Sequence, residues 1–262
     1  MTTPILLLGA GNMGGALLAG WLRAGAFPPE QLMIRDPKPS DQALASGALI
    51  DPDPAAMGRA KTVLLVVKPQ IWREAAAQVA PHLAADAVIV SIAAGVASAD
   101  IAAAFDGRRV ARVMPTTAAA IGQGTASIFA TDPVARDRAH ALFAAVGAVV
   151  DLADEDQMHA ATAVSGSAPA YLYAFVEALE AAGVSLGLSP EAARDLARAT
   201  TAGAAALMAE SGVAAADLRR QVTSPGGTTE AALKVLLGGT GLGALLKEAA
   251  SAAAHRSREL GQ

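Results

Sequence analysis

From Pro4 to Asp151, short runs of apolar residues alternate with longer alanine-rich stretches. The apolar runs predict strands at Ile5–Leu8, Leu32–Ile34, Val63–Val67, Val88–Ile92, Val110–Met114 and Val146–Val150. The stretches between them predict helices at Met13–Ala24, Trp72–His82, Ser98–Phe105 and Pro133–Ala145. Strands that are apolar at nearly every position are typical of a parallel sheet with both faces covered, and such helices suit the crossovers between parallel strands. The pattern therefore predicts a doubly wound α/β sheet.

After Asp151 the strand pattern stops, and helix-forming Ala, Leu, Glu and Arg predominate, interrupted by turn residues at Gly212 and Ser224–Gly227. An acidic cluster, Asp151–Asp156, separates the last predicted strand from the first long helix, and acidic residues at a helix start suit its dipole. For a length of 262 residues we expect two domains. We place the α/β domain at residues 1–152 and an all-α domain at residues 153–262.

A glycine-rich segment, GAGNMGGA at Gly9–Ala16, follows the first predicted strand and opens the first predicted helix. This G-x-G-x-x-G pattern in a strand–turn–helix context is typical of the dinucleotide-binding turn of Rossmann-type sheets. In that turn Gly9 permits the tight bend and Gly11 lets the backbone approach a pyrophosphate. Gly14 lets the helix pack against the strand, and the helix N-terminus faces the phosphates. We therefore expect NAD(P) as the cofactor, with FAD as a weaker alternative.

The residues at the end of the second predicted strand leave the choice between NADPH and NADH open. Asp36 favours NADH, because a carboxylate there accepts hydrogen bonds from the adenosine ribose. Arg35 and Lys38 flank it and favour NADPH, because they suit a 2′-phosphate.

Two further groups of residues lie where ligands are expected. The first stands at the later strand ends, in Val66–Gln70, Ser91–Gly95 and Arg112–Thr117, and ligands of open α/β sheets bind beyond such carboxyl ends. The second is the turn SPGGTTE at Ser224–Glu230, which leads into a helix whose free N–H groups suit a carboxylate. The alternative for this turn is a plain N-cap. However, Glu230 has no Ser or Thr three residues before it, so the capping box is incomplete, which favours a ligand role.

Composition narrows the function classes. The chain is 53% hydrophobic with a formal net charge of -4 and has no basic stripe, so we expect no nucleic-acid partner. It has no cysteine and only four scattered histidines, so we expect no metal site. The uncharged stretch Met158–Val176 carries His, Thr, Ser and Pro, which argues against a membrane span. The N-terminus lacks the features of a signal peptide, so we expect a cytoplasmic enzyme.

Taken together, these segments resemble the pyrroline-5-carboxylate reductase family from about Ile5 to Leu260. The resemblance lies in Gly9–Ala16, Val67–Gln70, Ser91–Val96, Arg112–Pro115, Ala163–Tyr171 and Val222–Thr229. It implies reduction of Δ1-pyrroline-5-carboxylate to L-proline, the last step of proline biosynthesis, by hydride transfer from NADPH or NADH. It also implies that the all-α domain is a dimerisation domain of a homodimer or higher homo-oligomer. From the residues alone, the small-residue faces along Met158–Ala182 and Ala199–Met208 fit a second subunit or a helical core within one chain.

The motifs and the resemblance together assign candidate site residues. The cofactor site is expected to comprise Gly9, Ala10, Gly11, Asn12, Met13, Gly14, Arg35, Asp36, Val66, Val67, Lys68, Pro69, Ile92, Ala93, Ala94, Pro115 and Thr116. The substrate site is expected to comprise Ser224, Gly226, Gly227, Thr228 and Thr229. Thr229 is also the candidate catalytic residue, through a hydrogen bond to the ring nitrogen. Two positions depart from the family pattern: Thr116 stands where the family has Asn, and Ala168 where it has Gly.

Three alternative functions compete with this interpretation. A β-hydroxyacid dehydrogenase depends on a lysine in its inter-domain helix, but none of the lysines lies between Asp151 and Gly212. Another imine reductase would use the same turn, so the exact substrate range stays open. A non-catalytic dinucleotide-binding protein would have no use for Ser224–Thr229.

Overall fold

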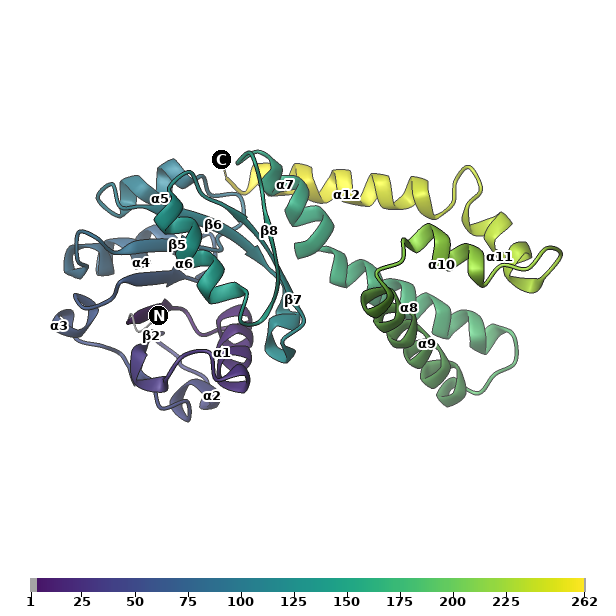
Figure 1. Ribbon diagram of the computed structural model, residues 1–262, viewed down its shortest axis with the longest axis horizontal. Coiled ribbons are helices and arrows are strands. Elements are labelled where there is room, and N and C mark those ends of the chain that lie inside the picture. The colour runs from purple at the N-terminus through teal and green to yellow at the C-terminus, as the bar shows by residue number, and fades with distance from the viewer. Residues whose placement is uncertain (1–3, 262) are drawn as a thin grey trace. The chain divides into compact units, whose positions relative to one another are not determined.

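The computed structural model describes residues 4–261 and divides into two compact units (Figure 1). One unit contains the sheet and comprises the residues up to Gly166 together with those from Ala252 onward; the other is Ser167–Ser251. The predicted boundary between residues 152 and 153 does not coincide with this division. Residues 153–166 and the end of the last helix pack with the sheet unit instead.

The sheet of the described residues has eight strands in the order β3-β2-β1-β4-β5-β6-β7-β8. Their bounds are β1 (Ile5–Leu8), β2 (Leu32–Arg35), β3 (Leu49–Ile50), β4 (Thr62–Leu65), β5 (Val88–Ser91), β6 (Val110–Pro115), β7 (Gly124–Phe129) and β8 (Gly147–Asp151). The first six strands pair in parallel. This order, with its reversal between β1 and β4, is that of a Rossmann-type sheet.

The sheet differs from the predicted one at the end that β7 and β8 form. β7 pairs antiparallel with β6, and β8 pairs parallel with β7, so the expectation of parallel pairing throughout is wrong at the β6–β7 junction. The sequence also gave no sign of β3 or β7. β3 is only two residues long, and β7 reads GTASIF, in which Gly, Thr and Ser interrupt the apolar pattern.

Helices cover both faces of the sheet (Figure 1). They are α1 (Asn12–Ala24), α2 (Asp41–Leu44), α3 (Pro54–Met57), α4 (Trp72–Val79), α5 (Ser98–Ala104) and α6 (Pro133–Phe143). Alternate residues of β1 belong to separate cores: Ile5 and Leu7 pack with α1 and α6, whereas Leu6 and Leu8 pack with α4 and α5. Burial on both faces explains why the strand reads as an uninterrupted apolar run.

The rest of the chain is helical, as predicted. α7 (Gln157–Ala161) and a π-helical turn, Thr162–Gly166, complete the first unit. The second unit contains α8 (Ala168–Ser185), α9 (Pro190–Ser211), α10 (Ala215–Gln221), α11 (Thr228–Leu236) and the first part of α12 (Leu242–Glu259). Among residues 4–261, no helix combines the length and apolar character needed to cross a membrane.

Candidate functional site

A cleft of about 500 Å³ opens at the carboxyl ends of β1, β2 and β4. This is the point at which the strand order reverses, where open α/β sheets bind their ligands. The predicted residues that line it are Gly9, Gly11, Arg35, Asp36, Val66, Val67 and Lys68. Sequence reasoning missed the opposite wall, which α4 and the residue before it provide through Ile71, Glu74, Ala75, Gln78 and Val79. Periodicity predicted this helix but not which of its faces meets the cleft.

The three glycines of the first turn meet three different demands. Gly9 has a φ of +97°, and a Cβ there would lie 2.8 Å from the carbonyl oxygen of Val66. A Cβ on Gly14 would overlap the carbonyl of Gly9, so only glycine lets α1 approach the turn. A Cβ on Gly11 would meet nothing within 4 Å, which leaves open space beside the backbone.

The N-terminus of α1 fits a pyrophosphate. Gly11 is its N-cap and provides no side-chain cap, so the N–H groups of Asn12 and Met13 begin the helix without one. Such N–H groups, together with the positive end of the helix dipole, bind phosphate oxygens. The open space at Gly11 admits the approach that this binding requires.

Asp36 holds the glycine turn in place as well as lining the cleft. Its Oδ2 accepts a hydrogen bond from the Ala10 N–H at 2.6 Å, and its Oδ1 accepts one from the Lys38 N–H at 2.8 Å. The carboxylate is therefore fixed at the cleft edge. Among residues 4–261, the side chain of the neighbouring Arg35 makes one ion pair, a long and exposed contact of 3.4 Å with Asp51, which holds its guanidinium weakly.

The remaining predicted cofactor residues do not line this cleft. Ile92, Ala93 and Ala94 follow β5, while Pro115 ends β6 and Thr116 follows it, so both groups stand at carboxyl strand ends further along the sheet. The Thr116 hydroxyl oxygen accepts a hydrogen bond from the Thr125 N–H at 2.9 Å. Thr116, one of the two residues that depart from the family pattern, is therefore hydrogen-bonded to β7. Pro69 follows Lys68 beyond β4 and is half-buried.

The second predicted turn precedes α11 in the helical unit. The Gly227 N–H donates to the Ser224 carbonyl at 3.0 Å, and Gly226 has a φ of +72°. Glu230 reaches back across the turn, and its Oε2 accepts from the Gly226 N–H at 2.6 Å. The Glu230 carboxylate therefore binds the N–H of the residue before the N-cap, not that of the N-cap Gly227, so this bond is not half of a capping box. Gly227, the N-cap, contributes no side-chain cap to α11.

Thr228 and Thr229 are the first two residues of α11. In the part of the chain that the structure describes, neither hydroxyl makes a hydrogen bond, and Thr229 is half-buried. A half-buried hydroxyl without a partner beside uncapped helical N–H groups provides both polar groups that a small carboxylate-bearing ligand needs.

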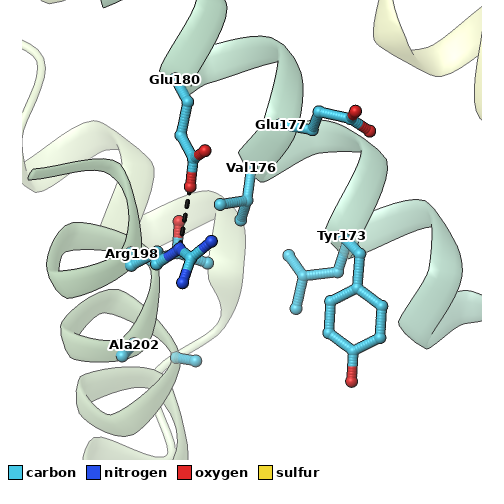
Figure 2. A pocket seen from close by; sticks show the side chains of 9 residues that line it. Tyr173, Val176, Glu177, Glu180, Arg198 and Ala202 are labelled. Atoms are coloured by element: carbon cyan, nitrogen blue, oxygen red, sulfur yellow. Dashed lines mark hydrogen bonds and ion pairs between the residues drawn. The ribbon is translucent and has the colours of Figure 1, made fainter. Parts of the chain in front are cut away.

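A second hollow, of about 650 Å³, lies between α8 and α9 (Figure 2). Tyr173 and Val176 from α8 and Ala202 from α9 line it, and an ion pair crosses it, in which the Arg198 Nε donates to Glu180 at 2.9 Å. The same two helices expose many large apolar side chains, including Leu172, Phe175, Leu179, Leu196, Leu207 and Met208. Exposed apolar surface of this kind marks a protein–protein contact.

Comparison with known proteins identifies relatives of both halves. Residues 155–260 match the sequence model of pyrroline-5-carboxylate reductase dimerisation, and residues 4–95 match that of coenzyme F420-dependent NADP oxidoreductases. A pyrroline-5-carboxylate reductase from Pseudomonas aeruginosa is 41% identical over 271 residues, covering 100% of this chain and 98% of that protein. The structure of a pyrroline-5-carboxylate reductase from Coxiella burnetii matches with a TM-score of 0.90 at 32% identity, covering 100% of each chain. That of pyrroline carboxylate reductase from Plasmodium falciparum with NADP bound matches with a TM-score of 0.86 at 25% identity, covering 99% and 98%.

Proposed function

The chain belongs to the pyrroline-5-carboxylate reductase family, and on this premise we propose that it reduces Δ1-pyrroline-5-carboxylate to L-proline with NADPH or NADH. The observation that carries the proposal is the glycine turn at the strand-order reversal, with open space at Gly11 beside the uncapped N-terminus of α1. We include in the proposal a cytoplasmic location and the absence of a nucleic-acid partner.

The sheet unit holds the dinucleotide in this proposal. The N–H groups at the start of α1 bind the pyrophosphate, and Asp36 and Arg35 face the adenosine ribose from the cleft edge. Ile92–Ala94, Pro115 and Thr116 stand at the strand ends assigned to the nicotinamide side. When bound, the reduced nicotinamide supplies the hydride.

The turn Ser224–Thr229 binds the imino acid in this proposal. The N–H groups at the start of α11 bind the substrate carboxylate, which the helix dipole favours. The Thr229 hydroxyl oxygen accepts a hydrogen bond from the N–H of the protonated imine. This bond orients the C=N carbon and keeps the ring nitrogen protonated, which makes that carbon a better hydride acceptor. The chain therefore needs no strong general base.

A single assay tests the reaction. The purified protein is given Δ1-pyrroline-5-carboxylate, the loss of NADPH or NADH absorbance is followed, and proline formation is measured, with added proline as a competitor. We expect dinucleotide oxidation in proportion to proline formed. Dinucleotide binding without any oxidation would contradict the proposal, and faster turnover of another cyclic imino acid would assign the chain to a related imine reductase activity.

Substitution of Asp36 by asparagine is expected to shift the cofactor preference toward NADPH. The change removes a fixed negative charge beside the ribose and keeps the side-chain size. Because it removes repulsion of a 2′-phosphate, we expect the NADPH-to-NADH ratio of kcat/KM to rise about tenfold, which corresponds to about 1.4 kcal/mol. Asp86→Asn, before the amino end of β5, is the control. An unchanged ratio in Asp36→Asn would place this carboxylate out of reach of the ribose.

The match to a dimerisation model indicates a homo-oligomer, and we propose that a second copy covers the faces of α8 and α9. Leu172→Glu is the test, because Leu172 lines the hollow between these helices and is 45% exposed. A buried charge without a partner opposes association. We expect light scattering to show a mass near 26.1 kDa for the variant and at least twice that for the wild type. Leu44→Glu, on α2 and 57% exposed, is the control and should keep the wild-type mass; a multimeric Leu172→Glu would contradict the placement.

A further inference from the structure

A partly buried ion pair joins β6 to the segment that follows β8. The Arg112 side chain is only 5% exposed, and its Nη1 donates to Glu155 Oε1 at 2.9 Å. Glu155 belongs to the acidic cluster Asp151–Asp156, for which the sequence suggested only a favourable helix dipole. The Glu155 side chain is 28% exposed, and the cost of burying the arginine charge is offset best when further hydrogen bonds satisfy the pair. The other hydrogen-bond partners of Glu155 therefore indicate which elements the ion pair holds together.

Glu155 holds the first residue of α5 with both of its oxygens. Its Oε1 accepts from the Ser98 N–H at 2.6 Å, and its Oε2 accepts from the Ser98 hydroxyl at 2.8 Å. The N-cap residue of α5, Ala97, has no side chain that can cap the helix. Glu155 thus supplies from a distant part of the sequence the carboxylate that helix starts favour. One carboxylate connects β6, α5 and the end of the sheet.

Glu155 keeps its negative charge at neutral pH. Burial raises the pKa of its carboxyl, but the hydrogen bonds from the Ser98 N–H and Arg112 outweigh burial and hold the pKa below its ordinary value. A charged carboxylate is therefore present at neutral pH for both the ion pair and the helix cap.

The segment Ile92–Ala97, between β5 and α5, is held at both ends and contacted at Gly95. At its start the Ser91 hydroxyl oxygen accepts from the Ala93 N–H at 3.2 Å, and at its end Glu155 holds Ser98. In the middle, Gly95 has a φ of +81°, and a Cβ there would lie 2.7 Å from the Gly261 nitrogen. The C-terminal residues therefore lie in close contact with this segment at Gly95.

We propose that Glu155, with Arg112, is a positioning residue for the dinucleotide, which acts by fixing the segment Ile92–Ala97. The inference rests on the proposed function, because it takes Ile92–Ala94 as part of the cofactor site. The same carboxylate also holds β6 three residues before its end at Pro115. It therefore sets the spacing between two strand ends that are both assigned to the nicotinamide side.

Dinucleotide affinity in Glu155→Gln and Ser98→Ala tests this inference without any turnover. Glu155→Gln removes the charge, and Ser98→Ala removes one donor and keeps the backbone N–H. Because bonds to charged groups are the stronger ones, we expect the Kd of NADPH, measured by calorimetry, to rise about tenfold in Glu155→Gln and about threefold in Ser98→Ala. Asp156→Asn, the exposed neighbour in the same cluster, is the control and should keep the wild-type Kd.

Kinetics then separate positioning from a general loss of stability. At saturating NADPH we expect the KM for the imino acid to stay within about twofold of the wild-type value, while the KM for NADPH follows the Kd. An unchanged Kd in both variants, whatever their melting temperatures, would overturn the inference. If Glu155→Gln does not fold, the Kd of NADPH in Ser98→Ala alone tests the inference, and an unchanged value overturns it. Failure of the proposed function is a separate result, because it appears as wild-type protein that binds NADPH and does not oxidise it.

Discussion

Substitution of Gly11 by valine is expected to raise the Kd of NADPH at least about a hundredfold, or about 2.7 kcal/mol, and to leave the fold intact. The backbone at Gly11 is extended, with a φ of -67°, and does not lie in the left-handed region that favours glycine. Its Cβ would meet no atom within 4 Å. The new side chain therefore begins in open space and occupies the region through which we expect the pyrophosphate to approach the N-terminus of α1.

The contrast with Gly14 makes this prediction specific. A Cβ on Gly14 overlaps the Gly9 carbonyl, so Gly14→Ala should lower the melting temperature, whereas Gly11→Val should melt like the wild type. Calorimetric titration with NADPH and thermal unfolding of both variants separate the two effects. A Gly11→Val protein that binds NADPH with wild-type affinity would mean that the dinucleotide does not approach α1 at this residue.

The glycine turn was predictable because its requirements are local. A tight bend, a close approach and a helix start each constrain one position within six residues, so spacing alone identifies Gly9, Gly11 and Gly14. The central strands were predictable for a related reason, since burial on both faces removes polar residues from them. β7 was not predicted, because small and polar residues interrupt its apolar residues and it contains no continuous apolar run.

The contacts that hold the site together were not predictable, because they join residues far apart in the sequence. Arg112 and Glu155 are 43 residues apart, and no spacing rule connects an arginine inside a strand to one member of an acidic cluster. The contact of Gly95 with the C-terminal residues is similar. This contact explains why the end of α12 belongs to the sheet unit. The sequence pattern of α12 alone resembles that of the other helices in the helical half.

The sequence also does not show which polar side chains of a turn are already engaged in hydrogen bonds. The spacing of Ser224–Glu230 predicted an incomplete capping box, but not that Glu230 would still bind the Gly226 N–H. That bond occupies the Glu230 carboxylate within the turn, whereas the hydroxyls of Thr228 and Thr229 make no hydrogen bond in the described part of the chain. Thr229 therefore stays the candidate for the hydrogen bond to the ring nitrogen.

Thr229→Val is accordingly expected to lower kcat about tenfold to a hundredfold, through loss of a hydrogen bond of roughly 1.5 to 3 kcal/mol to the charged ring nitrogen. Valine replaces the hydroxyl with a methyl group of similar size. Because the hydroxyl has no partner in the described part of the chain, the fold should lose little stability. Steady-state kinetics at saturating NADPH, together with thermal unfolding, measure the two effects separately.

Thr229→Ser is the matched control for this prediction, because it keeps the hydroxyl and removes only the methyl group. We expect its kcat to stay within about threefold of the wild type, since the bond to the ring nitrogen is retained. The loss in Thr229→Val should also be accompanied by an unchanged Kd for NADPH, because the turn and the glycine cleft belong to different units of the chain. Wild-type kcat in Thr229→Val would show that another group binds the ring nitrogen, and the hydroxyl of Thr228 would be the next residue to test.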